Sequence, residues 1–234
     1  MPGTRSSGLL ALGGIALAAV LAVIGHLEVN DDLNPLSLTV SDFAVSERGG
    51  VIDTAMAVLA AATAVLLPAL RRAGADRASI ALLAAWSAGL LAAAVVPTNE
   101  PGLPMDAAAY VHRYASVLSF LALPLAGWLL ARRPGGRPAR RLRALTVTSL
   151  LLAAAMIWSA YPGDRAMIGL TERLLILTET ALLATVALHL ARAAVVDIPV
   201  RAVDDVDGID PPGHSSSCSM SWRAASVIEP DRLG

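Results

Sequence analysis

Two glutamates in one apolar stretch are the residues whose types and spacing best suit chemistry in this chain. Glu172 and Glu179 lie seven residues apart in GLTERLLILTET, so an α-helix places them two turns apart on one face. If that helix begins near Leu170, Glu179 lies roughly 13 Å along it, close to the midplane of a bilayer core about 30 Å thick. Ionisable groups at that depth are costly and usually face a partner or water. We therefore treat both carboxylates as candidate functional groups.

Three interpretations of this pair are open. Glu179 can pair with an arginine, or stay protonated and bond to a neighbouring helix, which would fix the packing of the bundle. Two carboxylates at different depths can instead form a path for protons or cations. The third interpretation is recognition of a small ligand or a lipid headgroup, or chemistry on one. What decides among them is whether Glu179 faces a solvated cavity, another helix or lipid.

Further polar residues are expected at the same end of the membrane domain as Glu172. Arg173 follows it directly, and a histidine–arginine pair opens another apolar stretch at His112. An aspartate opens a third stretch on the same side. Together with the deeper glutamate, these residues make up the predicted polar site: Asp53, His112, Arg113, Glu172, Arg173 and Glu179.

Six apolar stretches must position these residues. Hydrophobic residues make up 56% of the 234-residue chain and charged residues 16%, below the roughly 25% charged of a soluble domain. Each stretch is long enough to cross a bilayer as a helix. We predict an all-α, polytopic membrane bundle in residues 1–194, with spans near 8–26, 51–70, 78–97, 112–131, 144–161 and 170–194.

The loops predict how the bundle is oriented. The connections at 71–77 and 132–143 are rich in arginine, whereas the alternate loops are acidic, with Arg48 and Arg165 as the only arginines clearly inside them. Arginine-rich loops stay in the cytoplasm. We therefore expect a multi-pass protein of the cytoplasmic membrane with both termini cytoplasmic. The first loop, about 24 residues from Leu27 to Gly50, is longer than a link requires, and we expect it to fold back over the outer mouth of the bundle.

Residues 195–234 differ from the rest and predict a disordered cytoplasmic tail. They combine the acidic DDVDGID with a segment rich in Pro, Gly and Ser. The acidic run is not an EF-hand, since a loop with Gly208 at position six would end at His214. Along the whole chain no GxSxG, HExxH or GxxxxGK[ST] motif occurs. We predict no cofactor. His26 and His112 lie near the outer ends of their spans, which raises two alternatives: they ligate a haem, or they are interfacial histidines that bond to water or headgroups.

Three segments resemble a known family. These are NPLSLTVSDFAVSERGG at 34–50, PTNEPG and YVHRYAS at 97–102 and 110–116, and GLTERLLILTET at 169–180. With six spans, they are similar to the uncharacterised bacterial membrane family called domain of unknown function 998. The resemblance covers about residues 8–194. It implies a multi-pass membrane protein and assigns no activity.

The sequence thus favours a binding, sensing or accessory role, with a small-molecule or lipid ligand at a polar site on the extracytoplasmic face. The alternative is a small-solute or proton-coupled transporter that uses a buried carboxylate. An intramembrane enzyme acting on lipid or a redox cofactor is the weaker alternative. We expect no enzymatic activity. The lipid bilayer is the expected partner, nucleic acid is not, and the oligomeric state is left open.

Overall fold

The computed structural model describes residues 3–28, 34–45, 50–100, 103–132 and 136–193. The chain divides near residue 198 into two units, and all described residues belong to the first, Met1–Ile198. The predicted tail, 195–234, lies outside the described residues.

The described residues form α-helices and no strands. Six of the helices are long and apolar enough to cross a membrane, which confirms the predicted all-α, polytopic architecture. The seventh is a short helix in the first loop. In chain order the helices are α1 (Thr4–Glu28), α2 (Val40–Ala44), α3 (Gly50–Arg72), α4 (Arg77–Val95), α5 (Ala107–Leu130), α6 (Gly136–Ala160) and α7 (Ile168–Ala193).

Helices α5 and α6 begin furthest ahead of their predicted spans, 112–131 and 144–161. Helix α5 begins at Ala107 because Asp106 caps it, accepting a hydrogen bond from the Ala109 backbone N–H at 2.8 Å. Helix α6 begins at Gly136 because arginine is a good helix former, so the helix runs through the arginine-rich stretch beyond the apolar window. The hydrophobic windows therefore located these two helices, and the helices extend beyond the windows at their N-terminal ends.

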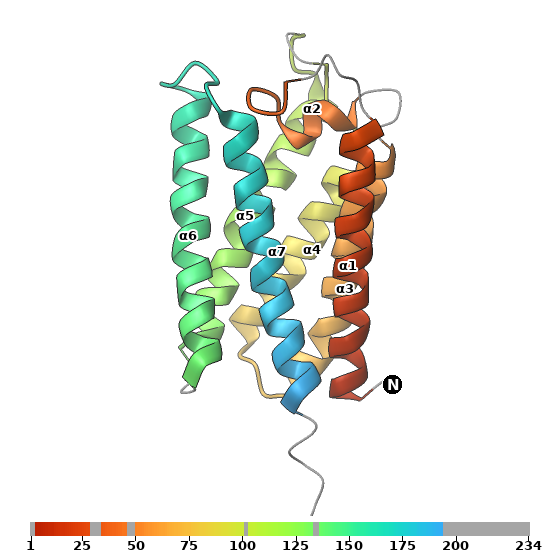
Figure 1. Ribbon diagram of the computed structural model, residues 1–234, viewed down its shortest axis with the longest axis vertical. Helices are drawn as coiled ribbons and strands as arrows, with labels where there is room; N and C mark the ends of the chain where they lie inside the picture. The colour runs from red at the N-terminus through yellow and green to blue at the C-terminus, as the bar shows by residue number, and fades with distance from the viewer. Residues whose placement is uncertain (1–2, 29–33, 46–49, 101–102, 133–135, 194–234) are drawn as a thin grey trace, which may run out of the picture. The chain divides into compact units, whose positions relative to one another are not determined.

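The six long helices form a closed ring. Each packs against the next long helix in the chain, and α7 closes the ring by packing against α1 (Figure 1). Helix α7 also contacts α3 and α5, and it lines the centre with the fully buried Leu175, Leu182 and Leu183. Gly8 of α1 meets the α7 backbone so closely that a Cβ would lie 2.6 Å from the Ala191 nitrogen. Close packing of α1 on α7 therefore requires a glycine at this position.

The two ends of the ring differ in their connections. Helix α2 lies across one end, which we call the α2 end, while the N-terminus lies at the other (Figure 1). The connection from α3 to α4, the end of α5 and the start of α6 lie at that opposite end, which we call the arginine-rich end. Since all predicted polar-site residues except Glu179 lie near helix ends on the α2 side, the site must be built there.

Candidate functional site

Helix α2 is a single short helix with its own capping box. The Thr39 hydroxyl accepts from the Asp42 backbone N–H at 3.1 Å, and the Asp42 carboxylate accepts from the Thr39 N–H at 2.7 Å. This exchange satisfies two backbone donors that a helix start leaves unpaired. A five-residue helix is nevertheless too short to be stable alone. Contacts with the ring must therefore hold it in place.

Glu172 of α7 supplies the first of these contacts. Its Oε2 accepts a hydrogen bond from the backbone N–H of Val40, the first residue of α2, at 2.5 Å. A helix N-terminus has unpaired N–H groups and a partial positive charge, so a carboxylate there is favoured. The Glu172 side chain is buried, with 4% of the residue exposed. A membrane-spanning helix thus caps the loop helix through one carboxylate.

Arg173 supplies the second contact. Its Nη1 donates to the carbonyl oxygens of Pro35 and Leu38, each at 2.8 Å, and to that of Gly169 at 3.0 Å. The guanidinium carbon also lies 4.8 Å from the centre of the Phe43 ring, within cation–π range. On the other side, Phe43 stacks on His26 of α1. Arg173 therefore fixes both the segment that leads into α2 and the aromatic residue on α2 itself.

Gly169 allows the loop backbone to approach α7. Its N–H donates to the Leu36 carbonyl at 3.0 Å. A Cβ at this position would overlap the carbonyl oxygens of Pro35 and Leu38, which are the acceptors that Arg173 uses. The neighbouring Gly169, Glu172 and Arg173 therefore act on the same loop.

His112 of α5 joins α2 to α4. Its Nδ1 lies 2.9 Å from the Val96 carbonyl, and because a carbonyl only accepts, Nδ1 carries a proton. In the neutral ring Nε2 is then an acceptor, and it lies 2.9 Å from the Ser41 hydroxyl of α2. This is the spacing of a nucleophile and its base. Ser41, however, does not line the pocket that His112 lines.

Asp42 forms an ion pair that the sequence analysis missed. Its Oδ2 lies 3.2 Å from Nη2 of Arg165 in the α6–α7 connection. Arg165 has a left-handed backbone with φ of 61°, as do Asp164 and Met167 with φ of 48° and 58°. Such conformations are uncommon outside glycine, and no sequence pattern signals them here. The pair links α2 to a loop 123 residues away in sequence.

A pocket of about 230 Å³ opens beside α2, between α3, α4 and α5. Asp53 of α3 and His112 line it together with the C-terminal end of α4 and the residues after α2. Pro97 has no N–H, so the Ala93 carbonyl of α4 has no helical partner four residues later. The polar side chains that line the pocket are those of Asp53, Thr98 and His112, and the Asp53 carboxylate suits a cation or a donor of hydrogen bonds. The full lining is Ala44, Val45, Asp53, Ala94, Val95, Val96, Pro97, Thr98 and His112.

Glu179 lies apart from this site, in the middle of the ring. It is 3% exposed, and its Oε2 accepts a hydrogen bond from Trp86 Nε1 of α4 at 3.3 Å. Its other oxygen has no hydrogen-bond partner among the described residues. Glu179 therefore faces another helix, and its partner is an indole, not an arginine. Trp86 lies in the middle of a predicted span, and this unusual position was the feature of the sequence that could have identified the partner.

The structure brings together four of the six predicted residues. Glu172, Arg173 and His112 contact α2 or the segment before it, and Asp53 shares the pocket with His112. Arg113 is exposed on α5, and no hydrogen bond or ion pair to the other five is present in the part that the structure describes. Within the same residues, no group of three His, Cys, Asp or Glu side chains is arranged to hold a metal ion.

Comparison with known proteins places the chain in a family. No curated protein and no solved structure matches it. The family described as Protein of unknown function (DUF998) matches residues 11–189, a stretch that includes α2 and most or all of each long helix. This is the family that the loop and helix motifs resemble. The chain is a multi-pass membrane protein, and it belongs to the family of proteins of unknown function DUF998.

Proposed function

We propose that this protein binds a small cationic solute at the α2 end, in the pocket between Asp53 and His112, and that α2 responds to its occupancy. The pocket is the single observation that carries the proposal, because it combines a charged side chain with a partly open volume at the end where buried polar groups gather. A volume of about 230 Å³ suits a ligand smaller than the usual cofactor or drug.

The chemistry of the pocket favours positive charge. Asp53 is the only carboxylate among the described lining residues. It lies in the first turn of α3, where the helix dipole stabilises a negative side chain. The C-terminal end of α4 presents carbonyl oxygens and the negative end of its own dipole. A primary amine would find both an ionic partner and several hydrogen-bond acceptors.

His112 couples the pocket to α2. Its ring lines the pocket, while its Nε2 bonds to Ser41 of α2. A ligand that displaces or reorients the His112 imidazole must change that hydrogen bond. Helix α2 depends on a few contacts with the six long helices. The loss of one contact therefore shifts the equilibrium between a docked and a released loop. This coupling fits a sensing or accessory role better than a passive binding site.

The proposal includes an orientation. The arginine-rich end faces the cytoplasm, because arginine in short loops is retained there. The α2 end then faces the extracytoplasmic side of the cytoplasmic membrane, and the start of α1 and the end of α7 face the cytoplasm. The ligand is accordingly an external solute. Fusing a reporter that is active only in the cytoplasm to the 71–77 connection tests this, and an inactive reporter there would contradict the orientation.

Calorimetric titration of the purified protein with ethanolamine tests the binding site, with acetate as the anionic comparison. We expect ethanolamine to bind and acetate not to bind. Asp53→Asn should weaken ethanolamine binding about ten-fold or more, because it removes a charge-assisted hydrogen bond.

Glu100→Gln is the matched control for this titration. It removes one negative charge from an exposed residue at the same end that does not line the pocket. Ethanolamine affinity should stay within about two-fold of wild type, since exposed charges are screened. Equal losses in the Asp53 and Glu100 variants, or equal binding of ethanolamine and acetate, would overturn the proposed site.

Proton-coupled transport through Glu179 is the second candidate. A buried carboxylate with an oxygen that has no described partner favours it. Against it, Glu179 lines neither the pocket beside Asp53 nor the pocket of about 160 Å³ at the arginine-rich end. Glu179→Gln in proteoliposomes separates the candidates: proton-coupled flux would be lost with this variant if Glu179 carries protons. Binding of ethanolamine at Asp53 would persist.

A further inference from the structure

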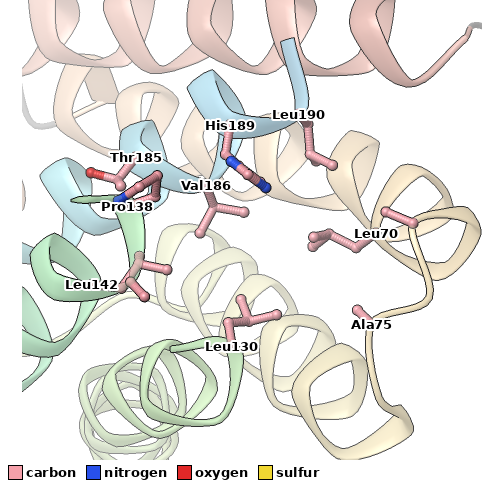
Figure 2. Close-up of a pocket in the computed structure, with 11 residues that line it drawn as sticks. Leu70, Ala75, Leu130, Pro138, Leu142, Thr185, Val186, His189 and Leu190 are labelled. Carbon is pink, nitrogen blue, oxygen red and sulfur yellow. The ribbon is translucent and has the colours of Figure 1, made fainter. Parts of the chain in front are cut away.

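A second pocket opens at the arginine-rich end, far from α2. It holds about 160 Å³ between the ends of α3, α5 and α7 and the start of α6. Figure 2 shows apolar side chains around it, with the imidazole of His189 among them. The lining consists of Leu70, Ala73, Ala75, Leu130, Pro138, Ala139, Leu142, Thr185, Val186, His189 and Leu190. An apolar pocket with two polar side chains, from Thr185 and His189, suits an amphipathic ligand.

Arginines flank this pocket on two helices. Arg141 follows the lining residue Pro138 by three positions on α6, and Arg192 follows His189 by three positions on α7. Residues three apart are neighbours on a helix surface, so each arginine lies next to a residue that lines the pocket. Both arginines are exposed. Their charges are therefore accessible on the two helices that line an apolar pocket.

The surrounding charge is strongly positive. Among the residues that the structure describes, the single acidic residue at this end is Asp76, which caps α4. The exposed arginines at this end are Arg5, Arg71, Arg72, Arg77, Arg132, Arg137, Arg140, Arg141, Arg143 and Arg192. Such a surface attracts anions and repels cations.

We propose that this pocket binds a phospholipid with an anionic headgroup from the adjoining leaflet. The phosphate would lie between Arg141 and Arg192, because a guanidinium binds phosphate oxygens with two parallel hydrogen bonds. The glycerol region and the first carbons of an acyl chain would enter the apolar pocket, with His189 and Thr185 near the ester groups. Basic pockets between membrane helices select anionic lipids in this way. A bilayer supplies this ligand at the helix ends, and the pocket is too small for a protein helix.

Native mass spectrometry of the delipidated full-length protein tests the proposal. Phosphatidylglycerol should remain bound at lower concentrations than phosphatidylcholine with the same acyl chains. Glycerol 1-phosphate in a separate titration distinguishes a lipid site from a simple phosphate site and should bind far more weakly than the lipid. Equal retention of the two lipids, or glycerol phosphate binding as tight as that of phosphatidylglycerol, would overturn the proposal.

The variant Arg141→Gln/Arg192→Gln should bind phosphatidylglycerol about ten-fold more weakly or worse, because two cations near the phosphate are removed. Its matched control is Arg5→Gln/Arg140→Gln, which changes the net charge at this end equally. Arg140 lies two positions before Leu142 and so on the opposite side of α6. The control should stay within about two-fold of wild type, and a ten-fold loss in the control would contradict a localised site.

Two further variants keep the test informative if the glutamine pair fails to fold. Arg141→Lys/Arg192→Lys preserves the charge and should retain most of the preference for phosphatidylglycerol. Ala139→Leu narrows the apolar pocket at a partly exposed position and should weaken binding of both lipids without removing the arginines. Unchanged lipid binding in Ala139→Leu would exclude the pocket as the acyl-chain site.

Discussion

Charged residues gather at both ends of the ring, but the two ends use them differently. At the α2 end, Glu172 and Arg173 are bound to backbone groups of the loop, and Glu172 is buried. At the arginine-rich end, Arg140, Arg141 and Arg192 are exposed. The same residue types therefore build structure at one end and remain accessible to solvent or lipid at the other.

This difference shows that loop charge in a membrane protein carries two kinds of information. Its sign predicts orientation, as the arginines do. Its position relative to backbone donors and acceptors decides whether the charge orders a loop, as Glu172 does for α2. Substitutions at the α2 end should accordingly change stability and loop order, whereas most substitutions at the opposite end should not.

The largest effect is expected from Gly169→Ala. The added Cβ would overlap the carbonyl oxygens of Pro35 and Leu38, so the loop must move and the Arg173 contacts must weaken. We expect the free energy of unfolding to fall by about 3 kcal/mol in a titration with sodium dodecyl sulfate. Gly13→Ala is the control, because a Cβ there meets nothing within 4 Å, and it should leave stability unchanged or raise it slightly. Equal effects of the two substitutions would contradict close packing of the loop on α7.

Arg173→Gln should have the next largest effect. It removes the cation that lies over Phe43 and the donor shared by three carbonyl oxygens. A loss of about 2 kcal/mol in the same titration is expected, since hydrogen bonds to charged groups are the stronger ones. Arg173→Lys keeps a cation with three donors and should fall between wild type and the glutamine variant. A lysine variant as unstable as the glutamine variant would show that the guanidinium shape, not its charge, holds the loop.

Asp76→Ala tests the one described acidic residue at the arginine-rich end. Asp76 caps α4 by accepting hydrogen bonds from the Ser79 hydroxyl at 2.6 Å and backbone N–H at 2.8 Å, and these bonds lower the pKa of its carboxyl. The substitution should cost about 1 kcal/mol at pH 7.

The pH dependence of this effect follows from the direction of the pKa shift. A carboxyl whose pKa is lower in the folded state stabilises the fold above its unfolded pKa, near 3.9, and loses that contribution as the pH falls through the folded value. The difference between Asp76→Ala and wild type should therefore shrink below about pH 4. A difference that stays constant from pH 7 to pH 3 would mean that the charge of Asp76 has no part in the cap.

Arg165→Gln should have the smallest effect at the α2 end. Its partner Asp42 also belongs to the capping box, but the Arg165 side chain is 48% exposed. Exposed ion pairs contribute about 0.5 kcal/mol and are screened by salt. We expect a loss of that size at low ionic strength and almost none in 1 M salt. A larger loss that persists in salt would place Arg165 among the residues that fix α2.

Much of the architecture could be predicted from sequence. Apolar length located six spans, and the motifs pointed to Glu172, Arg173 and His112 at one end. The separation of Glu172 from Glu179 by two helical turns also placed one carboxylate against the loop and the other in the middle of the ring. These features follow from local periodicity and helix geometry.

Other parts of the site depend on contacts that local patterns do not encode. Helix α2 has a capping signature in Thr39 and Asp42, but five residues are too few for a hydrophobic period. The approach of Arg165 to Asp42 requires left-handed residues in a distant loop. Aspartate at 164 is a type that adopts this conformation, but arginine at 165 and methionine at 167 give no such signal. Arg113 was placed in the site because it neighbours His112, yet adjacent helical residues face different directions. Its side chain is exposed as a result.

Hydrogen–deuterium exchange of the α2 amides tests the central claim most directly, that Glu172 holds α2 on the ring. The comparison uses wild type, Glu172→Gln at the α2 end and Arg140→Gln at the other. We expect exchange in α2 to be about ten-fold or more faster in Glu172→Gln, because the charge-assisted bond to the Val40 N–H is weakened. Arg140→Gln should leave α2 unchanged. Equal α2 exchange in wild type and Glu172→Gln would contradict the account.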